Sequence, residues 1–229
     1  MTPDIKVLSA LATRQAYLEL VPQFERASGR KVATTWAGTV DIVKRISAGD
    51  SYDLIIAPKN TIDDFIQGGM VEGGSRIDIA RTGIGIAIRR GAQPPDIGSA
   101  EALKRALIAA KTVGYSTGPS GVYLTALFER MGIAAEIKAK SRQVPPGATV
   151  GPIVACGEAE IGFQQMSELL HVDGIDVVGP LPAEIQYITV ISCAIPTAAK
   201  EQDAARALAR FLAAPSARDA IEQAGLQPV

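Results

Sequence analysis

The strongest constraint on the fold is a repeated alternation of short apolar runs with helix-like segments. Residues 5–8, 31–36 and 53–57 form strand-like runs, and each is followed by small residues and a helix-favouring stretch. The run D-L-I-I-A at 53–57 is apolar enough to be buried on both faces of a sheet. Because only a few residues separate the elements, the pattern predicts parallel strand–helix–strand units and an α/β fold.

Two longer strand-like segments, at 82–89 and 185–195, have the length to cross between two lobes. The first carries Gly83 and Gly85, which weaken an ordinary core strand. These glycines either absorb a hinge rotation or allow a neighbouring helix to approach closely, and both interpretations stay open.

Local signals predict further elements along the chain. A threonine before an apolar-periodic run is a common N-cap, and tight turns separate strands from helices. The expected elements are a helix over 61–67 with Thr61 as its N-cap, a strand at 112–115, a helix from about Ser120, a strand at 137–144 and a helix over 148–156.

Four turns share one construction, in which a strand, small residues and a helix N-terminus follow one another. The orphan N–H groups and the dipole at such a terminus can bind an anion without Lys or Arg. Open α/β sheets place ligands at the carboxyl ends of their strands, although each turn alone could be an ordinary cap. With one polar strand end added, the candidate ligand-binding residues are Leu11, Ala12, Thr13, Gly38, Thr39, Ser120, Gly121, Gly147, Ala148, Gln164 and Gln165.

Charge balance and residue counts argue against several classes of function. With 23 basic and 24 acidic residues the net charge is −1, which argues against a nucleic-acid-binding protein. The single histidine, His171, rules out a histidine-rich metal site and is expected in a surface loop. Cys156 and Cys193 lie far apart and are interpreted as two buried thiols without a disulfide. No metal and no cofactor are therefore predicted.

Three aspartates are weaker candidates for chemistry. Asp53, Asp63 and Asp64 could suggest an acid/base pair or a Mg²⁺ site. They fit better as the start of a strand and the first turn of a helix, where carboxylates interact well with the dipole. The strand end Gln164–Gln165 points either into a ligand site or into solvent.

The first residues, M-T-P-D-I-K-V-L-S-A, enter directly into a strand-like run. They show no basic region, long apolar region or cleavage site of a signal peptide. No stretch reaches the ~20 apolar residues that cross a bilayer. As written, the chain is expected to be cytoplasmic and not to insert into a membrane; it would be periplasmic if a leader had been removed from it.

Several strings together resemble one protein family and span nearly the whole chain. They are V-L-S-A-L-A-T, F-E-R-A-S-G-R-K-V, T-W-A-G-T-V, I-S-A-G-D-S-Y-D-L-I-I-A, G-P-S-G-V-Y-L and G-E-A-E-I-G-F. The chain resembles the molybdate-binding branch of the type II periplasmic binding proteins (substrate-binding protein family 1). This resemblance implies two Rossmann-like lobes, 1–80 with 191–229 and 81–190, joined by two crossing strands.

The resemblance also implies a function. It predicts a solute-binding protein that holds a small anion, an oxyanion such as molybdate or a small carboxylate, in a cleft between the lobes. An ABC permease would be a partner only if the chain is exported. The family's ligand positions fall on Ala12, Thr39, Ser120, Gly147 and Gln165. Ala12 stands where the family typically has Ser, and Gln165 where it has Tyr, so a preference for molybdate does not follow.

The alternative is a small-carboxylate isomerase on the same fold. Some members similar to this branch are aconitate isomerases, which move a double bond between cis and trans isomers. Such a reaction needs a general base, for which Glu168 and His171 are the candidates. Few other titratable groups are expected near the site, so binding without catalysis is the first hypothesis.

Overall fold

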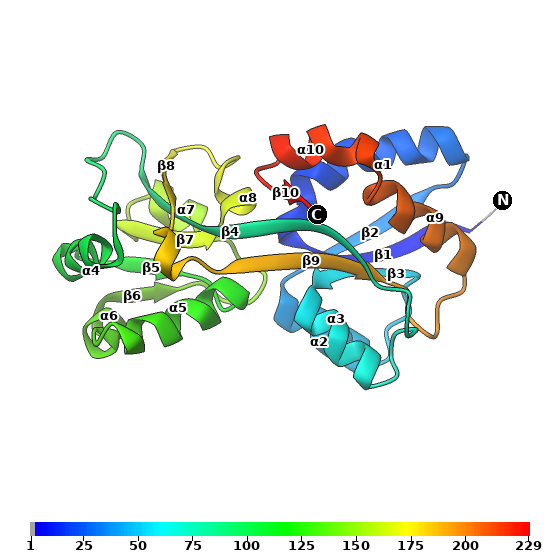
Figure 1. Cartoon of the computed structure of the whole chain (residues 1–229), viewed down its shortest axis with the longest axis horizontal. Coiled ribbons are helices and arrows are strands. Elements are labelled where there is room, and N and C mark those ends of the chain that lie inside the picture. The colour runs from blue at the N-terminus through cyan, green and yellow to red at the C-terminus, as the bar shows by residue number, and fades with distance from the viewer. Residues whose placement is uncertain (1–2) are drawn as a thin grey trace. The chain divides into compact units, whose positions relative to one another are not determined.

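The computed structural model describes residues 3–229 and divides the chain into two compact units (Figure 1). Unit 1 combines the chain up to Thr82 with Thr189–Val229, and unit 2 is Gly83–Ile188. The chain thus passes between the units twice, inside strand β4 (Ile77–Arg89) and at the start of strand β9 (Ile188–Ala194). The limits predicted from the sequence, residues 80 and 190, lie near these crossings.

Unit 1 is built around parallel strands. Strand β1 pairs with β2 and β3 in parallel, β9 runs antiparallel to β3 and lies beside β4, and the short β10 pairs with β4. Helices α1, α9 and α10 cover one face of this sheet, and α2 and α3 cover the other (Figure 1). The elements are β1 Ile5–Ala10, η1 Leu11–Thr13, α1 Arg14–Ser28, β2 Val32–Ala37, α2 Thr39–Ser47, β3 Leu54–Pro58, α3 Lys59–Gln67, α9 Gln202–Leu212, η3 Pro215–Ala217, α10 Arg218–Gln223 and β10 Gln227–Pro228.

Strand β3 shows why this sheet carries helices on both faces. Leu54 and Ile56 pack in the cluster that includes side chains of α1, α9 and α10. Their neighbours Ile55 and Ala57 pack with side chains of α2 and α3. Alternate residues of a strand point to opposite faces of the sheet. Because helices cover both faces, all four residues are fully buried. The α/β fold predicted from this apolar run is confirmed.

Unit 2 is also a sheet packed against helices, but the sheet is smaller. Its strand order is β4-β7-β5-β6, and β8 also pairs with β4. Strand β5 is parallel to β6 and β7, whereas β4 is antiparallel to β7. One core cluster lies under α4, α5 and α6, and another under α7 and α8. The elements are α4 Ala100–Ala109, β5 Val113–Tyr115, α5 Pro119–Arg130, α6 Ala134–Lys140, β6 Ser141–Gln143, α7 Gly151–Ala155, β7 Ile161–Gln165, α8 Met166–Leu169, β8 Ile175–Pro180 and η2 Ala183–Ile185.

Three local predictions were wrong in whole or in part. The expected strand at 137–144 is helix α6 up to Lys140, because the I-K-A-K pattern continues a run of strong helix formers in which only Ile137 is buried. Its later part does form a strand, β6 at Ser141–Gln143. The expected helix over 148–156 is the shorter α7. Helix α3 begins at Lys59 after Pro58, so that Thr61 is a buried residue inside the helix and not its cap.

The glycines of β4 are packed closely within unit 2. Neither has a positive φ. A Cβ on Gly83 would lie 3.0 Å from Nε2 of Gln186, and one on Gly85 would lie 3.0 Å from Sδ of Met166. The Gln186 amide is itself held on β4, since Oε1 accepts from the N–H of Ile84 at 2.9 Å and Nε2 donates to its carbonyl at 3.0 Å. Of the two interpretations of these glycines, these contacts support close packing.

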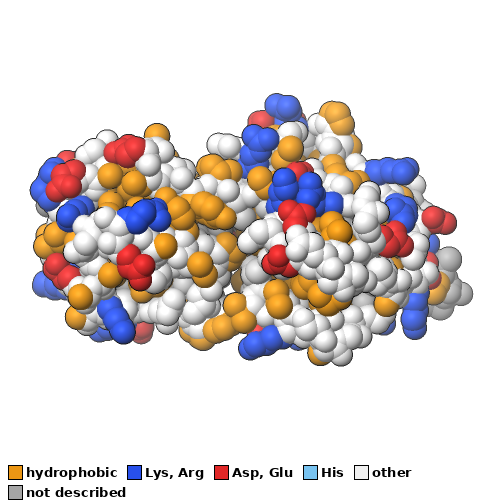
Figure 2. Space-filling view, turned by 60° about the horizontal axis from the view of Figure 1, so that its bottom comes forward, with side chains coloured by type: hydrophobic (Ala, Val, Ile, Leu, Met, Phe, Trp, Pro, Cys, Tyr) orange, Lys and Arg blue, Asp and Glu red, His pale blue; other side chains and the backbone are white. Residues whose placement is uncertain are grey.

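The surface shows no broad area of one charge on the face drawn in Figure 2, where basic and acidic side chains are interspersed. Among residues 3–229, no helix has the length and apolar character needed to cross a membrane.

Candidate functional site

In unit 1 the first candidate turn is fixed by a pair of buried hydroxyls. Residues Leu11–Thr13 form a 3-10 turn that leads directly into α1. The Oγ1 of Thr13 lies 2.9 Å from Oγ of Ser9 and donates to the carbonyl of Ala10 at 3.0 Å. Both side chains are almost fully buried. The hydroxyl of Thr13 therefore holds the turn in shape, and Ala12, at its centre, brings no polar side chain.

The second candidate turn of unit 1 lies between β2 and α2. Gly38 is the N-cap of α2 with no side-chain hydrogen bond, and Thr39 is the first helical residue. The carbonyl of Gly38 accepts from the N–H of Ile42 at 2.9 Å, which closes the first helical turn. A glycine cap without a side-chain acceptor leaves the early N–H groups of the helix to an external partner. This geometry matches the predicted turn.

In unit 2 the start of α5 has the same construction with more hydroxyls. Gly118 is the N-cap and Pro119 the first helical residue. The Oγ atoms of Ser116 and Ser120 lie 3.2 Å apart, and the N–H of Gly118 donates to Oγ of Ser116 at 3.3 Å. A Cβ on Gly121 would lie 1.6 Å from the carbonyl oxygen of Ser116. Only glycine fits there, and the close approach presses the strand end against the first turn of the helix.

Ser9 and Ser116 are not among the predicted residues, although the sequence contains a signal for them. In S-A-L-A-T and S-T-G-P-S a serine precedes a second hydroxyl by four residues across the strand–helix turn. In both units the two hydroxyls are neighbours, at 2.9 Å for Ser9 with Thr13 and 3.2 Å for Ser116 with Ser120. The spacing itself could have pointed to them.

The strand end at Gln164 connects two other candidate segments. Its Oε1 accepts from the N–H of Val150 at 2.6 Å, and its Nε2 donates to the carboxylate of Glu168 at 2.9 Å. The residue Glu168 is half-buried as a whole, but its carboxyl group lies in the interior. Burial raises the pKa of Glu168 to about 7, against a smaller lowering by the Gln164 hydrogen bond. Gln165, the adjacent candidate, is also buried.

The turn that carries Gly147 and Ala148 differs from the prediction. Gly147 has a φ of 79°, and the N–H of Ala148 donates to the carbonyl of Pro145 at 3.1 Å. Helix α7 begins only at Gly151 and is five residues long. Both residues thus lie in a turn ahead of the helix. The expected helix N-terminus at this place was wrong, because the double proline and the glycine form a separate turn before the helix.

Two of the three aspartate candidates have structural partners, and the third, Asp64, is exposed. Asp53 accepts from three backbone N–H groups, of Lys6 at 2.8 Å, Lys200 at 2.9 Å and Glu201 at 3.0 Å. Asp63 forms an ion pair with Arg76. His171 is exposed, as predicted. In the part of the chain that the structure describes, no cluster of His, Cys, Asp and Glu has the composition of a metal site.

The two cysteines are unpaired, and only one is buried. Burial raises the pKa of the Cys193 thiol to about 12. Cys156 is exposed, which corrects the expectation of two buried thiols. It follows α7 as its C-cap, a position where the short helix ends at the surface.

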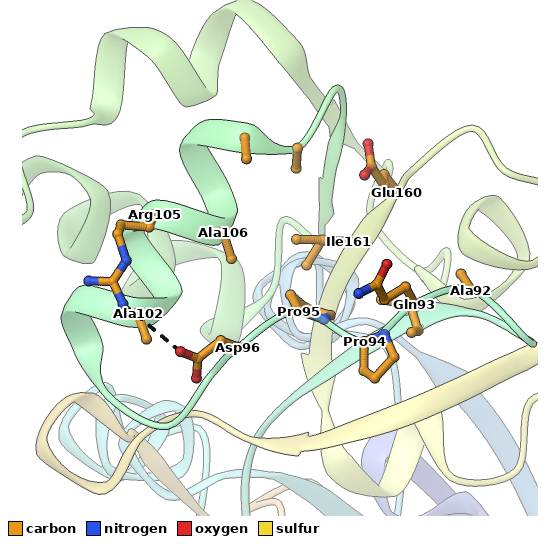
Figure 3. A pocket seen from close by; sticks show the side chains of 13 residues that line it. Ala92, Gln93, Pro94, Pro95, Asp96, Ala102, Arg105, Ala106, Glu160 and Ile161 are labelled. Carbon is orange, nitrogen blue, oxygen red and sulfur yellow. Dashed lines mark ion pairs between the residues drawn. The ribbon is translucent and has the colours of Figure 1, made fainter.

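Unit 2 also contains a cavity of about 580 Å³ that none of the candidate residues lines. It lies between the proline-rich loop 92–96, helix α4 and the start of β7 (Figure 3). Arg105 and Asp96 form a loose pair at its edge, with 3.9 Å between their charged atoms, and the side chains of both are mostly exposed. The cavity is therefore separate from the predicted ligand residues.

Comparisons with known proteins agree on the type of molecule. A model of the family described as "Bacterial extracellular solute-binding protein" matches residues 5–227. An aconitate isomerase of a Pseudomonas species is 38% identical and covers 98% of this chain and 88% of its own length. The molybdate-binding protein ModA of Azotobacter vinelandii is 27% identical, over 97% of this chain and 89% of its own.

A solved structure agrees with the fold. The periplasmic molybdate-binding protein of Azotobacter vinelandii superimposes with a TM-score of 0.80 at 19% identity, over 97% of this chain and 98% of that one. The prediction of the type II periplasmic binding protein fold is confirmed.

Proposed function

Because this chain belongs to the bacterial extracellular solute-binding proteins, we propose that its ligand is a small anion that carries carboxylate groups. The relative named aconitate isomerase, whose name denotes a tricarboxylate, shares more identity with the chain than ModA does. The candidate residues contain no Lys and no Arg, so that the ligand would be held by N–H and hydroxyl donors.

The observation that carries this proposal is the start of α5. Two buried hydroxyls, of Ser116 and Ser120, lie beside the first turn of the helix, where Gly121 keeps the backbone unencumbered. Hydroxyls that can donate beside helix N–H groups suit the oxygens of a carboxylate. In unit 1, Gly38 and Thr39 offer a similar start of α2. The prediction from sequence that both units contribute to one site stays a prediction.

A thermal-shift panel tests the proposal with cis-aconitate, trans-aconitate, citrate, molybdate, tungstate, sulfate and phosphate. We expect a carboxylate to stabilise the protein most. A ligand at 100 times its Kd adds about 2.7 kcal/mol to the unfolding free energy, so binding should be visible as a higher melting temperature. Ser120→Ala and Thr39→Ala should each weaken that response, whereas Ser141→Ala, which removes a hydroxyl outside the candidate set, should leave it intact. A panel without any response contradicts the proposal.

A second candidate function is isomerisation of a small carboxylate. It is supported by the 38% identical relative and by Glu168, whose pKa of about 7 suits a group that removes and returns a proton near neutral pH. NMR of trans-aconitate with the protein would detect the cis isomer directly. Conversion that Glu168→Gln abolishes and His171→Ala leaves intact would support this candidate; the absence of conversion would contradict it.

The proposal includes a location and a partner. The family description supports a place outside the cytoplasm. The partner that we propose for the exported protein is an ABC permease, which would receive the ligand. Osmotic-shock fractionation of the source bacterium, followed by immunoblotting, tests the location. Protein found only with the cytoplasmic fraction would contradict both parts.

A further inference from the structure

Glu168 is joined to the candidate ligand segments by one side chain. Gln164 is the next-to-last residue of β7, and both ends of its amide are hydrogen-bonded. Its Oε1 accepts from the N–H of Val150, and its Nε2 donates to the carboxylate of Glu168. Val150 closes the loop that carries Gly147 and Ala148, and Gln165 follows directly in the chain. Two hydrogen bonds in series therefore connect the carboxyl group of Glu168 to the loop of Gly147 and Ala148. Gln165 lies only three residues before Glu168 in the chain.

The surroundings of Glu168 carry almost no charge. The loop 144–150, helix α7 and strand β7 contain no titratable residue, and no ion pair joins Glu168 to any residue of the described chain. The charged and titratable residues of the other adjoining segments are Asp78, Arg81 and Arg89 on β4, His171 and Asp173 in the exposed turn after α8, and Asp176 on β8.

These contacts give an ionised Glu168 little to balance an added negative charge. Gln164 donates a single neutral hydrogen bond to it, and Asp176 is engaged with the N–H of Gly91 at 2.8 Å. An anion that binds among the candidate residues brings negative charge to the same end of unit 2. Like charges in a weakly solvated place disfavour the ionised form of a carboxyl group. The protonated form removes the repulsion and can keep its contact with Gln164.

We propose that the binding of an anion by this protein is linked to the uptake of one proton by Glu168. The inference rests on the proposed function, because it needs an anion at the candidate residues. The proton leaves a hydronium ion or a buffer acid in the solvent, whose bond to it breaks, and it forms an O–H bond with the carboxylate. The protein would then bind its ligand more tightly in mildly acidic than in alkaline surroundings.

Isothermal calorimetry with trans-aconitate and with molybdate tests the link. Titrations at about pH 8 in two buffers of different ionisation enthalpy give the number of protons taken up on binding. We expect about one more proton for the wild type than for Glu168→Gln, and an affinity that falls about tenfold for each pH unit above the pKa. The matched control Glu158→Gln removes the same charge from an exposed position of unit 2 and should behave as the wild type.

The outcomes separate the two proposals. Binding with equal proton uptake in the wild type and in Glu168→Gln overturns the proton link and leaves the proposed function standing. Binding of neither probe overturns the proposed function and the link with it. If Glu168→Gln does not fold, infrared difference spectra of the wild type decide: a protonated-carboxyl band that grows on addition of either probe supports the link, and its absence overturns it.

Discussion

Gly121 is held by the closest approach described in the candidate site. Its Cα lies so near Ser116 that an added Cβ would be 1.6 Å from the carbonyl oxygen and 2.6 Å from the carbonyl carbon. Both are backbone atoms, which no rotamer change can move. We expect Gly121→Ala to lower the unfolding free energy by about 3 kcal/mol or more and to abolish ligand binding, because the strand end and the helix start must separate.

Gly118, three residues earlier, provides the control for this substitution. A Cβ there would meet only Oγ of Ser116 at 3.6 Å, an ordinary contact, and its φ of −77° suits any residue. Urea denaturation of Gly118→Ala should therefore show a change within about 1 kcal/mol. Equal losses in both variants would contradict the assignment of the effect to the contact between Gly121 and Ser116.

Glu168 makes the stability of the protein depend on pH. Its pKa rises on folding from the ordinary 4.5 to about 7, so the folded state favours the neutral carboxyl. This contribution is complete below about pH 4.5 and is lost as the pH rises through 7. Above pH 7 we expect Glu168→Gln to be more stable than the wild type by up to about 3 kcal/mol, with no difference near pH 4.5.

Denaturant melts across this pH range measure the difference. Glu158→Gln supplies the baseline for the loss of an exposed carboxylate. A stability difference that does not change with pH would contradict the assignment of the titrating group to Glu168.

Single residues of the candidate site could be predicted only where local geometry determined them. The positions of Thr39, Ser120 and Gly121 at helix starts were predictable because turn and capping rules act within a few residues of sequence; their role in binding stays a prediction. The engagement of Gln164 with Val150 and Glu168 was not predictable, since it depends on how a loop folds back on a strand. The position of Ser116 beside Ser120 was predictable from their spacing of four residues, but Ser116 was not among the predicted residues.

In strand β4, the side-chain amide of Gln186 forms hydrogen bonds with the backbone of Ile84 as a neighbouring strand would. Oε1 of Gln186 accepts from the N–H groups of Ile84 at 2.9 Å and Tyr187 at 2.8 Å, and Nε2 donates to the Ile84 carbonyl at 3.0 Å. We expect Gln186→Leu to lower the unfolding free energy by about 2 kcal/mol, because the N–H groups of Ile84 and Tyr187 lose their acceptor, whereas the Ile84 carbonyl keeps the N–H of Leu181. Gly83→Val should have a comparable effect, since its side chain would displace the same amide.

Gln23→Leu serves as the control for this pair. Its amide is exposed and donates one local hydrogen bond to Glu19. Chemical denaturation should show it near the wild type. If Gln186→Leu is equally mild, the three hydrogen bonds of Gln186 contribute little to the stability of unit 2.

Helices and strands that bury many residues were easier to predict than those that bury few. Strand β3 is apolar throughout because helices cover both its faces, and it was found from that run alone. Helix α6 buries a single residue, Ile137, and its alternating lysines imitate a half-exposed strand. Where few positions face the core, periodicity gives little information, and propensity decides.

The chain as a whole carries one thiol in each unit, with opposite accessibility. Cys156 of unit 2 is exposed, and Cys193 of unit 1 is fully buried with a pKa raised to about 12. We expect one thiol to react rapidly with a maleimide in the native protein, and the second to react only as unit 1 unfolds. Mass spectrometry of timed samples measures both. Rapid modification of two thiols, or of none, would contradict the prediction.

Fold and family were readable from the whole sequence because many short strings and the alternation of elements act together. We predict that ligand identity depends on few positions, such as Gln165 and Ala12, which has no hydroxyl. Each donor changes binding by about 1–3 kcal/mol, so one substitution can change the preferred anion without a change of fold. That is why the sequence predicts a small-anion binder more firmly than it predicts the anion.

Trp36 gives this chain a built-in optical probe. It is the only tryptophan, it lies in β2 two residues before Gly38, and it is partly exposed. The Tyr17 ring meets it edge-on with 5.2 Å between centroids, and the guanidinium carbon of Arg14 lies 5.9 Å from its centroid. Indole emission responds to nearby charge and to water, so tryptophan fluorescence reports on the end of β2 in unit 1 and on the start of α1 that packs against it. A shift in the wavelength of tryptophan emission, measured on unlabelled protein, would thus show whether a ligand changes the environment of Trp36.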